Sequence, residues 1–174
     1  MSRHTARTPI RTCPTSTHRR RSPLGRAALL LVRAADAAAA EHPRTASGLC
    51  RQALTLAPHL YEGWCLMARL AESAGRVDDA VRAYGHAIDL EPDAPDALFR
   101  LGSLLRREGR FDEALQPLRI AVRLRPSHGP SQTELGLVLL HLGGTEDAAY
   151  WLGCAAGTDR RARRLLRHLE QRAA

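Results

Sequence analysis

The 174-residue sequence contains no lysine and no asparagine, so all 26 of its basic side chains are arginine. Without lysine, the protein can form no lysine Schiff base and has no lysine nucleophile. Lysine and asparagine codons are rich in A and T, so their absence indicates a GC-rich, bacterial genome. The missing residue types therefore exclude covalent catalysis by lysine and suggest a bacterial source.

Groups that commonly form catalytic or metal sites are also sparse. The four cysteines, Cys13, Cys50, Cys65 and Cys154, lack the spacing of zinc ligands, and the eight histidines occur singly. No glycine-rich loop suits a phosphate, and no serine has a nucleophile-elbow context. We therefore predict no metal, no cofactor and no enzymatic activity. The cysteine usage favours a reducing compartment, and we expect a cytoplasmic protein.

Charge is distributed unevenly along the chain. Residues 1–26 contain seven arginines and no acid, while the net charge of the whole chain is only +8. This segment is rich in Arg, Ser, Thr and Pro without apolar periodicity, and we predict that it is disordered. Three functional interpretations remain open: a transit peptide, a twin-arginine export signal, or an arm that binds nucleic acid or an acidic membrane. The first two would place the protein in an organelle or outside the cytoplasm.

Long apolar runs are absent as well. The run 27–32 ends at Arg33 after six residues, which is too short for a convincing signal core, and we predict no membrane span. Aromatic residues make up only 4% of the chain, whereas alanine is abundant. This composition suits thin, closely packed helices better than a bulky globular core.

The sequence does contain an internal period, equal to the interval from Gly75 to Gly109. Positions in four registers recur at this interval: Pro58, Pro92 and Pro126; Gly75, Gly109 and Gly143; Ala46, Ala80, Ala114 and Ala148; Ala53, Ala87, Ala121 and Ala155. Within 95–126, apolar residues at helical spacing predict two helices separated by Gly109. With Leu98, Leu101, Gly102, Ala114 and Ala121 at their places, this unit resembles a tetratricopeptide repeat.

The resemblance implies an all-α fold: a right-handed superhelical solenoid of about four repeats with a C-terminal capping helix. We place the repeats at 27–60, 61–94, 95–128 and 129–162, the first and last being degenerate, and the capping helix at 160–172. Thr45 is predicted to cap the second helix of the first repeat. Pro117 is predicted to kink the second helix of the third.

The resemblance also implies a concave groove lined by the first helix of each repeat. Chaperone-binding members of the family use lysine and asparagine in this groove to clamp a terminal carboxylate. That clamp is absent here, as is the asparagine ladder of sugar-transferring relatives. The residues that we expect to contact a partner are Arg69, Glu72, Phe99, Ser103, Arg106, Arg107, Thr133 and His141. Two other interpretations of the arginines are a solvated face and internal neutralisation by nearby acids such as Glu72 and Asp96.

The leading hypothesis is a protein-interaction module, a scaffold or adaptor that binds a peptide or helix of a partner in this groove. One alternative is an accessory subunit or targeting region of a larger system, such as a glycosyl- or sulfotransferase or an envelope or secretion assembly. Another is nucleic-acid binding through the arginine-rich residues 1–26, which a steep salt dependence would reveal.

Overall fold

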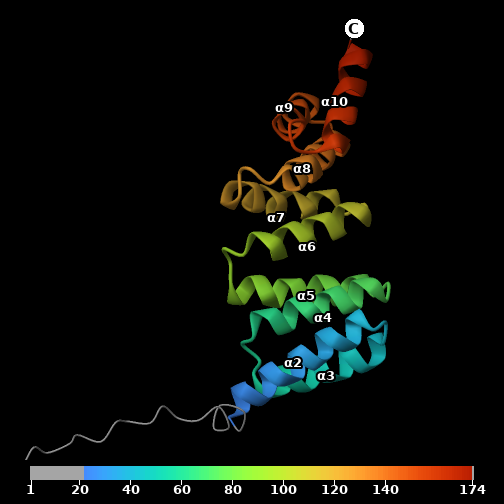
Figure 1. Ribbon diagram of the computed structural model, residues 1–174. Helices are drawn as coiled ribbons and strands as arrows, with labels where there is room; N and C mark the ends of the chain where they lie inside the picture. The colour runs from blue at the N-terminus through green and yellow to red at the C-terminus, as the bar shows by residue number, and fades with distance from the viewer. Residues whose placement is uncertain (1–21, 174) are drawn as a thin grey trace, which may run out of the picture. The chain divides into compact units, whose positions relative to one another are not determined.

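The computed structural model describes residues 22–173, which form nine α-helices and no β-strand (Figure 1). The all-α prediction is thus confirmed over this part of the chain. The predicted disorder of residues 1–21 lies outside the described residues. The helices are α2 (Pro23–Ala39), α3 (Pro43–Leu56), α4 (Tyr61–Ser73), α5 (Val77–Leu90), α6 (Pro95–Arg107), α7 (Phe111–Leu124), α8 (Gly129–His141), α9 (Thr145–Ala155) and α10 (Arg160–Ala173).

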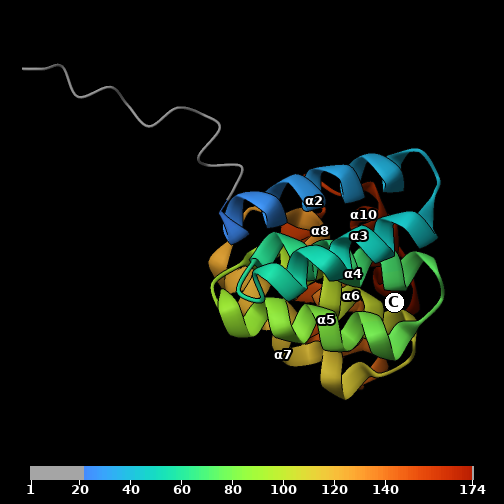
Figure 2. The same ribbon diagram turned by 90° about the horizontal axis from the view of Figure 1, so that it is seen from below.

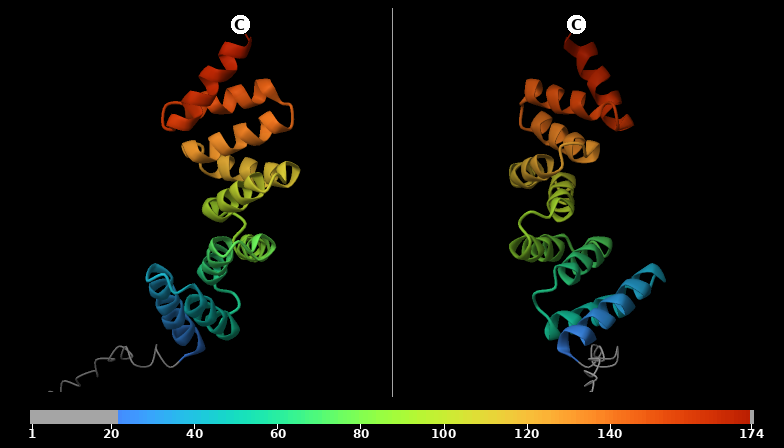
Figure 3. Two further views of the ribbon diagram at one scale, coloured as in Figure 1. Left: turned by 90° about the vertical axis from the view of Figure 1, so that its right-hand side faces the viewer. Right: turned by 60° about the vertical axis from the view of Figure 1, so that its left-hand side comes forward.

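The chain divides into two compact units at Pro58. In the first unit, α2 and α3 pack against each other as a helical hairpin (Figure 2). In the second unit, the hairpins α4–α5, α6–α7 and α8–α9 follow in chain order, each packed against the next, and α10 packs against α9 (Figure 3). Each repeat-length segment therefore contributes one helical hairpin.

The same backbone turn closes every hairpin of the second unit. Gly75, Gly109 and Gly143 have φ values of 69°, 75° and 85°, in the left-handed region that glycine adopts without steric cost. The amide that follows each of them bonds back to a carbonyl near the helix end, as Arg76 N does to Ala71 O at 2.9 Å. This is the Schellman arrangement that ends a helix and reverses the chain. The regular spacing of these glycines therefore reflects a structural requirement.

The first hairpin makes this turn without glycine. Glu41, which stands one repeat before Gly75, has a φ of 60° and is the single non-glycine residue with positive φ within 22–173. The amide of His42 bonds to Ala37 O at 2.9 Å, as in the other hairpins. Because a side chain in this region clashes with its own backbone, Glu41 carries a strain that the glycines avoid.

Glycine and alanine allow the paired helices to approach closely. A Cβ atom added to Gly102 of α6 would lie 2.4 Å from Leu118 Cγ of α7, and one added to Gly136 would lie 2.8 Å from Leu152 Cγ. Ala114 is fully buried in the same cluster as Leu118. The leucine side chains thus fill the space that the glycines leave open, which fixes the register of each hairpin.

The C-terminal helix covers the last hairpin. Ala162 of α10 is buried with Leu152 and Ala155 of α9, and three leucines of α10, Leu165, Leu166 and Leu169, pack against this cluster. The prediction of a C-terminal capping helix is therefore confirmed. The apolar stripe of α10 faces α9, and the other positions within 160–171, which are mostly arginine, are exposed.

Two local expectations differ from the structure. Helix α3 begins at Pro43 after His42, with no capping side chain, so the prediction that Thr45 caps it is wrong. Helix α2 begins at Pro23, where the Ser22 hydroxyl accepts a hydrogen bond from Gly25 N at 3.0 Å. The predicted N-terminal tail therefore includes a first helical turn at 23–26. Helix α7 continues through Pro117, and the expected kink remains a prediction.

Candidate functional site

The predicted groove face lies on the first helices of the hairpins in the second unit, α4, α6 and α8. Ion pairs connect these helices in sequence: Glu72 of α4 with Arg107 of α6, Arg106 of α6 with Glu134 of α8, and Glu134 with Arg161 of α10. We call these three pairs the ion-pair ladder. Each connects residues at least 27 positions apart in sequence, so the ladder joins neighbouring hairpins and the capping helix.

Glu72 has two partners. Its carboxylate accepts a hydrogen bond from the guanidinium of Arg107 and another from the hydroxyl of Tyr84, with the Tyr84 oxygen at 3.2 Å. Tyr84 of α5 is completely buried in a cluster with residues of α4 and α6. Burial raises the pKa of its hydroxyl first, and the charge of Glu72 raises it further, so Tyr84 remains a hydrogen-bond donor. Glu72 therefore joins α4 both to α5 and to α6.

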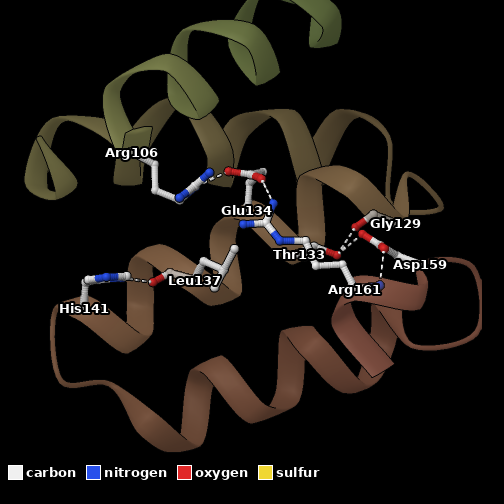
Figure 4. A network of polar contacts seen from close by, with 8 residues as sticks. All are labelled: Arg106, Gly129, Thr133, Glu134, Leu137, His141, Asp159 and Arg161. Carbon is white, nitrogen blue, oxygen red and sulfur yellow. Dashed lines mark hydrogen bonds and ion pairs between the residues drawn. The ribbon is translucent and has the colours of Figure 1, made fainter. Parts of the chain in front are cut away.

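Glu134 is more deeply placed and lies between two arginines (Figure 4). One carboxylate oxygen accepts from Arg106 Nε, and the other accepts from Arg161 Nη1 at 2.9 Å. The side chains of Glu134 and Arg106 are only 10% and 15% exposed, whereas that of Arg161 is 52% exposed. Charges with so little contact with water require a partner, because desolvation of an unpaired charge costs several kcal/mol.

The start of α10 makes a second polar contact with α8. Thr133 Oγ1 lies 2.6 Å from Asp159 Oδ2 and 3.0 Å from Gly129 O, and Asp159 Oδ1 accepts from Arg161 N at 2.8 Å. Burial raises the pKa of Asp159, but hydrogen bonds from Thr133 and from the backbone of Arg161 and Ala162 outweigh it and hold the pKa below its usual value. Asp159 therefore caps α10 and attaches it to α8.

These contacts cover Thr133, one of the two α8 residues that were predicted to contact a partner. Thr133 is 1% exposed, and the consecutive residues 131–139 are all buried. His141, at the end of the helix, is exposed, but its ring stacks on Phe111 with centroids 4.1 Å apart, and Nδ1 lies 2.8 Å from Leu137 O. In this conformation Thr133 has its hydrogen bonds within the protein. We therefore remove it from the residues that we propose for partner contact.

The arginines predicted for the groove fall into two groups. Arg106 and Arg107 are paired with Glu134 and Glu72, which is the internal neutralisation considered from the sequence. Arg69 is exposed on α4, and no described acid pairs with it. Asp96, the other acid expected to act locally, pairs instead with Arg125 at 2.9 Å.

The remaining predicted residues lie on α6. Phe99 is partly buried, packs against the core around Leu118, and meets the ring of His128 edge-on with centroids 5.1 Å apart. The hydroxyl oxygen of Ser103 is buried and has no hydrogen-bond partner among the described residues. Phe99 and Ser103 are one helical turn apart and so lie on the same side of α6.

Sequence reasoning missed Arg100, which is exposed and follows Phe99 directly. Burial raises the pKa of the Cys65 thiol on α4, a hydrogen bond with Tyr61 opposes this effect, and the charge of Arg100 opposes it more weakly, so Arg100 lies within electrostatic range of a predicted groove position of the preceding hairpin. The family resemblance does not assign the repeat position of Arg100 to the groove. Arg100 and Glu134 occupy this same position in successive repeats.

We define the open patch as Cys65 and Arg69 of α4 together with Phe99, Arg100 and Ser103 of α6. It contains two exposed guanidinium groups and a partly exposed aromatic ring, whereas the hydroxyl oxygen of Ser103 is buried. Within 22–173, no group of three His, Cys, Asp or Glu side chains is arranged to hold a metal ion. No described helix combines the length and apolar character needed to cross a membrane. The patch is thus suited to contact an acidic and partly apolar group.

Comparison with known proteins identifies the repeat and the fold. A family model described as tetratricopeptide repeat matches residues 65–129. No curated protein matches the sequence. Among solved structures, MamA from Desulfovibrio magneticus RS-1, from residue 41 to its end, has a TM-score of 0.78 at 19% identity, covering 84% of this chain and 85% of that chain.

Two further structures are similar. A structure of MamA AMB-1 has a TM-score of 0.70 at 23% identity and covers 77% of this chain and 73% of that chain. YrrB, described as a TPR protein with an unusual peptide-binding site, has a TM-score of 0.70 at 19% identity, with 83% and 74% covered. Residues 65–129 are therefore tetratricopeptide repeat sequence, and the described part of the chain has the tetratricopeptide repeat fold, which confirms the family resemblance.

Proposed function

We propose that the protein is a non-catalytic scaffold or adaptor that binds a peptide or helix of a partner protein at the open patch. The observation that carries this proposal is the contrast between paired and unpaired arginines on one face. Arg106 and Arg107 have acidic partners within the protein, whereas Arg69 and Arg100 are exposed and have no ion pair with any described acid. The peptide-binding description of YrrB supports a function of this class.

The chemistry of the patch defines the ligand that we expect. Guanidinium groups bind carboxylates through two parallel hydrogen bonds, so Arg69 and Arg100 favour acidic side chains or a C-terminal carboxylate. Phe99, which directly precedes Arg100, offers a partly exposed apolar ring. The ligand is therefore an acidic segment that also carries an aliphatic or aromatic side chain.

A random-peptide display selection on the full-length protein tests this proposal. Enriched peptides should combine acidic and apolar residues, and Arg69→Glu/Arg100→Glu should weaken a class of them at least tenfold, since a hydrogen bond to a charged group contributes about 1.5–3 kcal/mol. The matched control is Arg160→Glu/Arg164→Glu, which makes the same change of charge at exposed positions of α10. Unchanged affinity in the folded patch variant would contradict the assignment.

A truncation separates the N-terminal segment from the patch. Because α2 begins at Pro23 and is capped by Ser22, the truncated protein should start at Ser22 so that the first helix stays intact. Peptide binding at the patch should survive this deletion. Binding of nucleic acid that falls steeply with salt and disappears with residues 1–21 would instead assign a function to the N-terminal segment.

A further inference from the structure

The second unit has a pocket on the other side of α8, among α7, α8 and α9. Its volume is about 770 Å³, and the buried side chains of Val122, Leu135 and Leu139 contribute to its lining. This size falls in the range of roughly 300–1,000 Å³ that is typical of ligand pockets. We call it the α7–α9 pocket. The repeat pattern gave no indication of it.

The pocket is separate from the groove face. Successive residues of a helix are rotated by about 100°, so the α8 residues that line the pocket, Gln132, Leu135 and Leu139, together lie on the side of the helix away from Thr133 and Glu134, which contact α10. The remaining lining residues come from α7, α9 and the α7–α8 connection. A partner in this pocket would therefore leave the ion-pair ladder and the open patch uncovered.

Two aromatic side chains of α9 line the pocket, and one of them is exposed. Tyr150 of α9 lines it and is 64% exposed, which makes it the most exposed of the large hydrophobic side chains in the described chain. Its ring meets that of Trp151 edge-on, with centroids 5.1 Å apart, and Trp151 in turn packs against the core. Exposed aromatic residues beside an apolar pocket are typical of protein-interaction surfaces, where tyrosine and tryptophan often dominate the binding energy.

Two arginines give the pocket its charge. Arg119 and Arg123 lie one helical turn apart on α7, both are exposed, and neither has an ion pair with another described residue. The acid that lines the pocket, Asp147, has no ion pair with either of them. The pocket therefore joins an apolar floor to two available guanidinium groups, and it is complementary to a segment with the opposite charge.

We propose that the α7–α9 pocket is a second docking site, which takes a short acidic segment of a partner protein. An aromatic or long aliphatic side chain of that segment enters the cavity between Trp151 and Leu139, and adjacent carboxylates bind Arg119 and Arg123. With a site on each side of α8, one copy of the protein can hold two partner segments at once. This assignment is independent of the function proposed for the open patch.

The display selection described above tests the pocket with different variants. A distinct class of acidic peptides with an aromatic or aliphatic residue should lose at least tenfold in affinity with Arg119→Glu/Arg123→Glu. The same class should lose at least tenfold with Tyr150→Ala, which removes exposed apolar surface without changing charge. Affinity should be unchanged by Arg69→Glu/Arg100→Glu and by the control Arg160→Glu/Arg164→Glu, which matches the pocket variant in both charge and i,i+4 spacing.

The variants should all fold, because each substituted side chain is exposed, and circular dichroism and a thermal melt verify this. Peptides that respond only to the open-patch variant would support the proposed function and overturn the docking site. Peptides that respond only to the pocket variants would do the reverse. Selection of basic or uncharged peptides by the pocket would also overturn the proposal, because its specificity for acidic segments rests on Arg119 and Arg123.

Discussion

Replacing Arg106 with methionine is expected to destabilise the second unit through the charge that it leaves unpaired. Arg106 and Glu134 are 15% and 10% exposed, so removal of the guanidinium leaves a carboxylate that has little contact with water. Removing one partner of a buried ion pair costs about 3–5 kcal/mol. Because Arg161 still contacts Glu134 at 2.9 Å, we expect a smaller loss of about 1–3 kcal/mol.

The double variant Arg106→Met/Glu134→Met should recover this loss. Two methionines fill similar volume without any charge to desolvate, and replacement of a buried pair by apolar residues is often neutral or stabilising. We expect its unfolding free energy to lie within about 1 kcal/mol of the wild-type value or above it. The coupling between the two positions then measures the pair itself, apart from the loss of packing.

Urea denaturation of the full-length protein, followed by the fluorescence of its two tryptophans, Trp64 and Trp151, and by far-UV circular dichroism, measures these values. Unfolding of a repeat protein need not be two-state, so both signals are required. If Arg106→Met stays within about 0.5 kcal/mol of the wild type by both signals, as an ordinary surface substitution does, the claim that the ladder holds α6 to α8 is refuted. A double variant no more stable than Arg106→Met would refute its electrostatic origin.

Three further predictions concern packing, backbone strain and pH. Gly102→Ala should destabilise the protein by about 1–3 kcal/mol through overpacking against Leu118. Gly85→Ala, with nothing within 4 Å of the added Cβ, should stabilise it by up to about 1 kcal/mol. Urea denaturation compares the two variants, and equal effects would contradict the close packing at Gly102. Glu41→Gly should raise the melting temperature, because glycine removes the left-handed strain, and an unchanged or lower value would contradict that strain. Asp159→Ala should lower the free energy of unfolding by about 0.5–2 kcal/mol at neutral pH. Because the pKa of Asp159 is depressed in the folded protein, the difference in unfolding free energy between wild type and variant should shrink as the pH falls below about 4. A constant difference from pH 7 to pH 3 would contradict this prediction.

The internal period of the sequence was sufficient to predict the helical hairpins. Gly75, Gly109 and Gly143 recur at this period because each occupies a left-handed turn, and Gly102 and Gly136 because each faces a leucine across the hairpin. Such positions are recognisable in a sequence since the backbone or the packing admits few alternatives. Glu41 shows the limit of this reasoning: the fold imposes the turn there even though the residue does not favour it.

The candidate site was less predictable, because it depends on contacts between hairpins. The repeat pattern placed Arg106 and Arg107 on the groove face but gave no means to decide that Glu134 and Glu72 would pair with them. Glu134 and Arg100 occupy a position that the family resemblance does not assign to the groove. The α7–α9 pocket depends on the spacing of three helices, which no local pattern records.

The central claim is that the groove face contains arginines of two kinds, one that stabilises the protein and one that binds a partner. The most direct test measures, for Arg69→Glu and Arg106→Met, the affinity for the same patch-dependent acidic peptide and the unfolding free energy. We predict that Arg69→Glu lowers the affinity about tenfold or more while stability changes by less than about 0.5 kcal/mol. Arg106→Met should retain the affinity and lose about 1–3 kcal/mol of stability. The reverse result, with binding lost at Arg106 and stability lost at Arg69, would contradict the account.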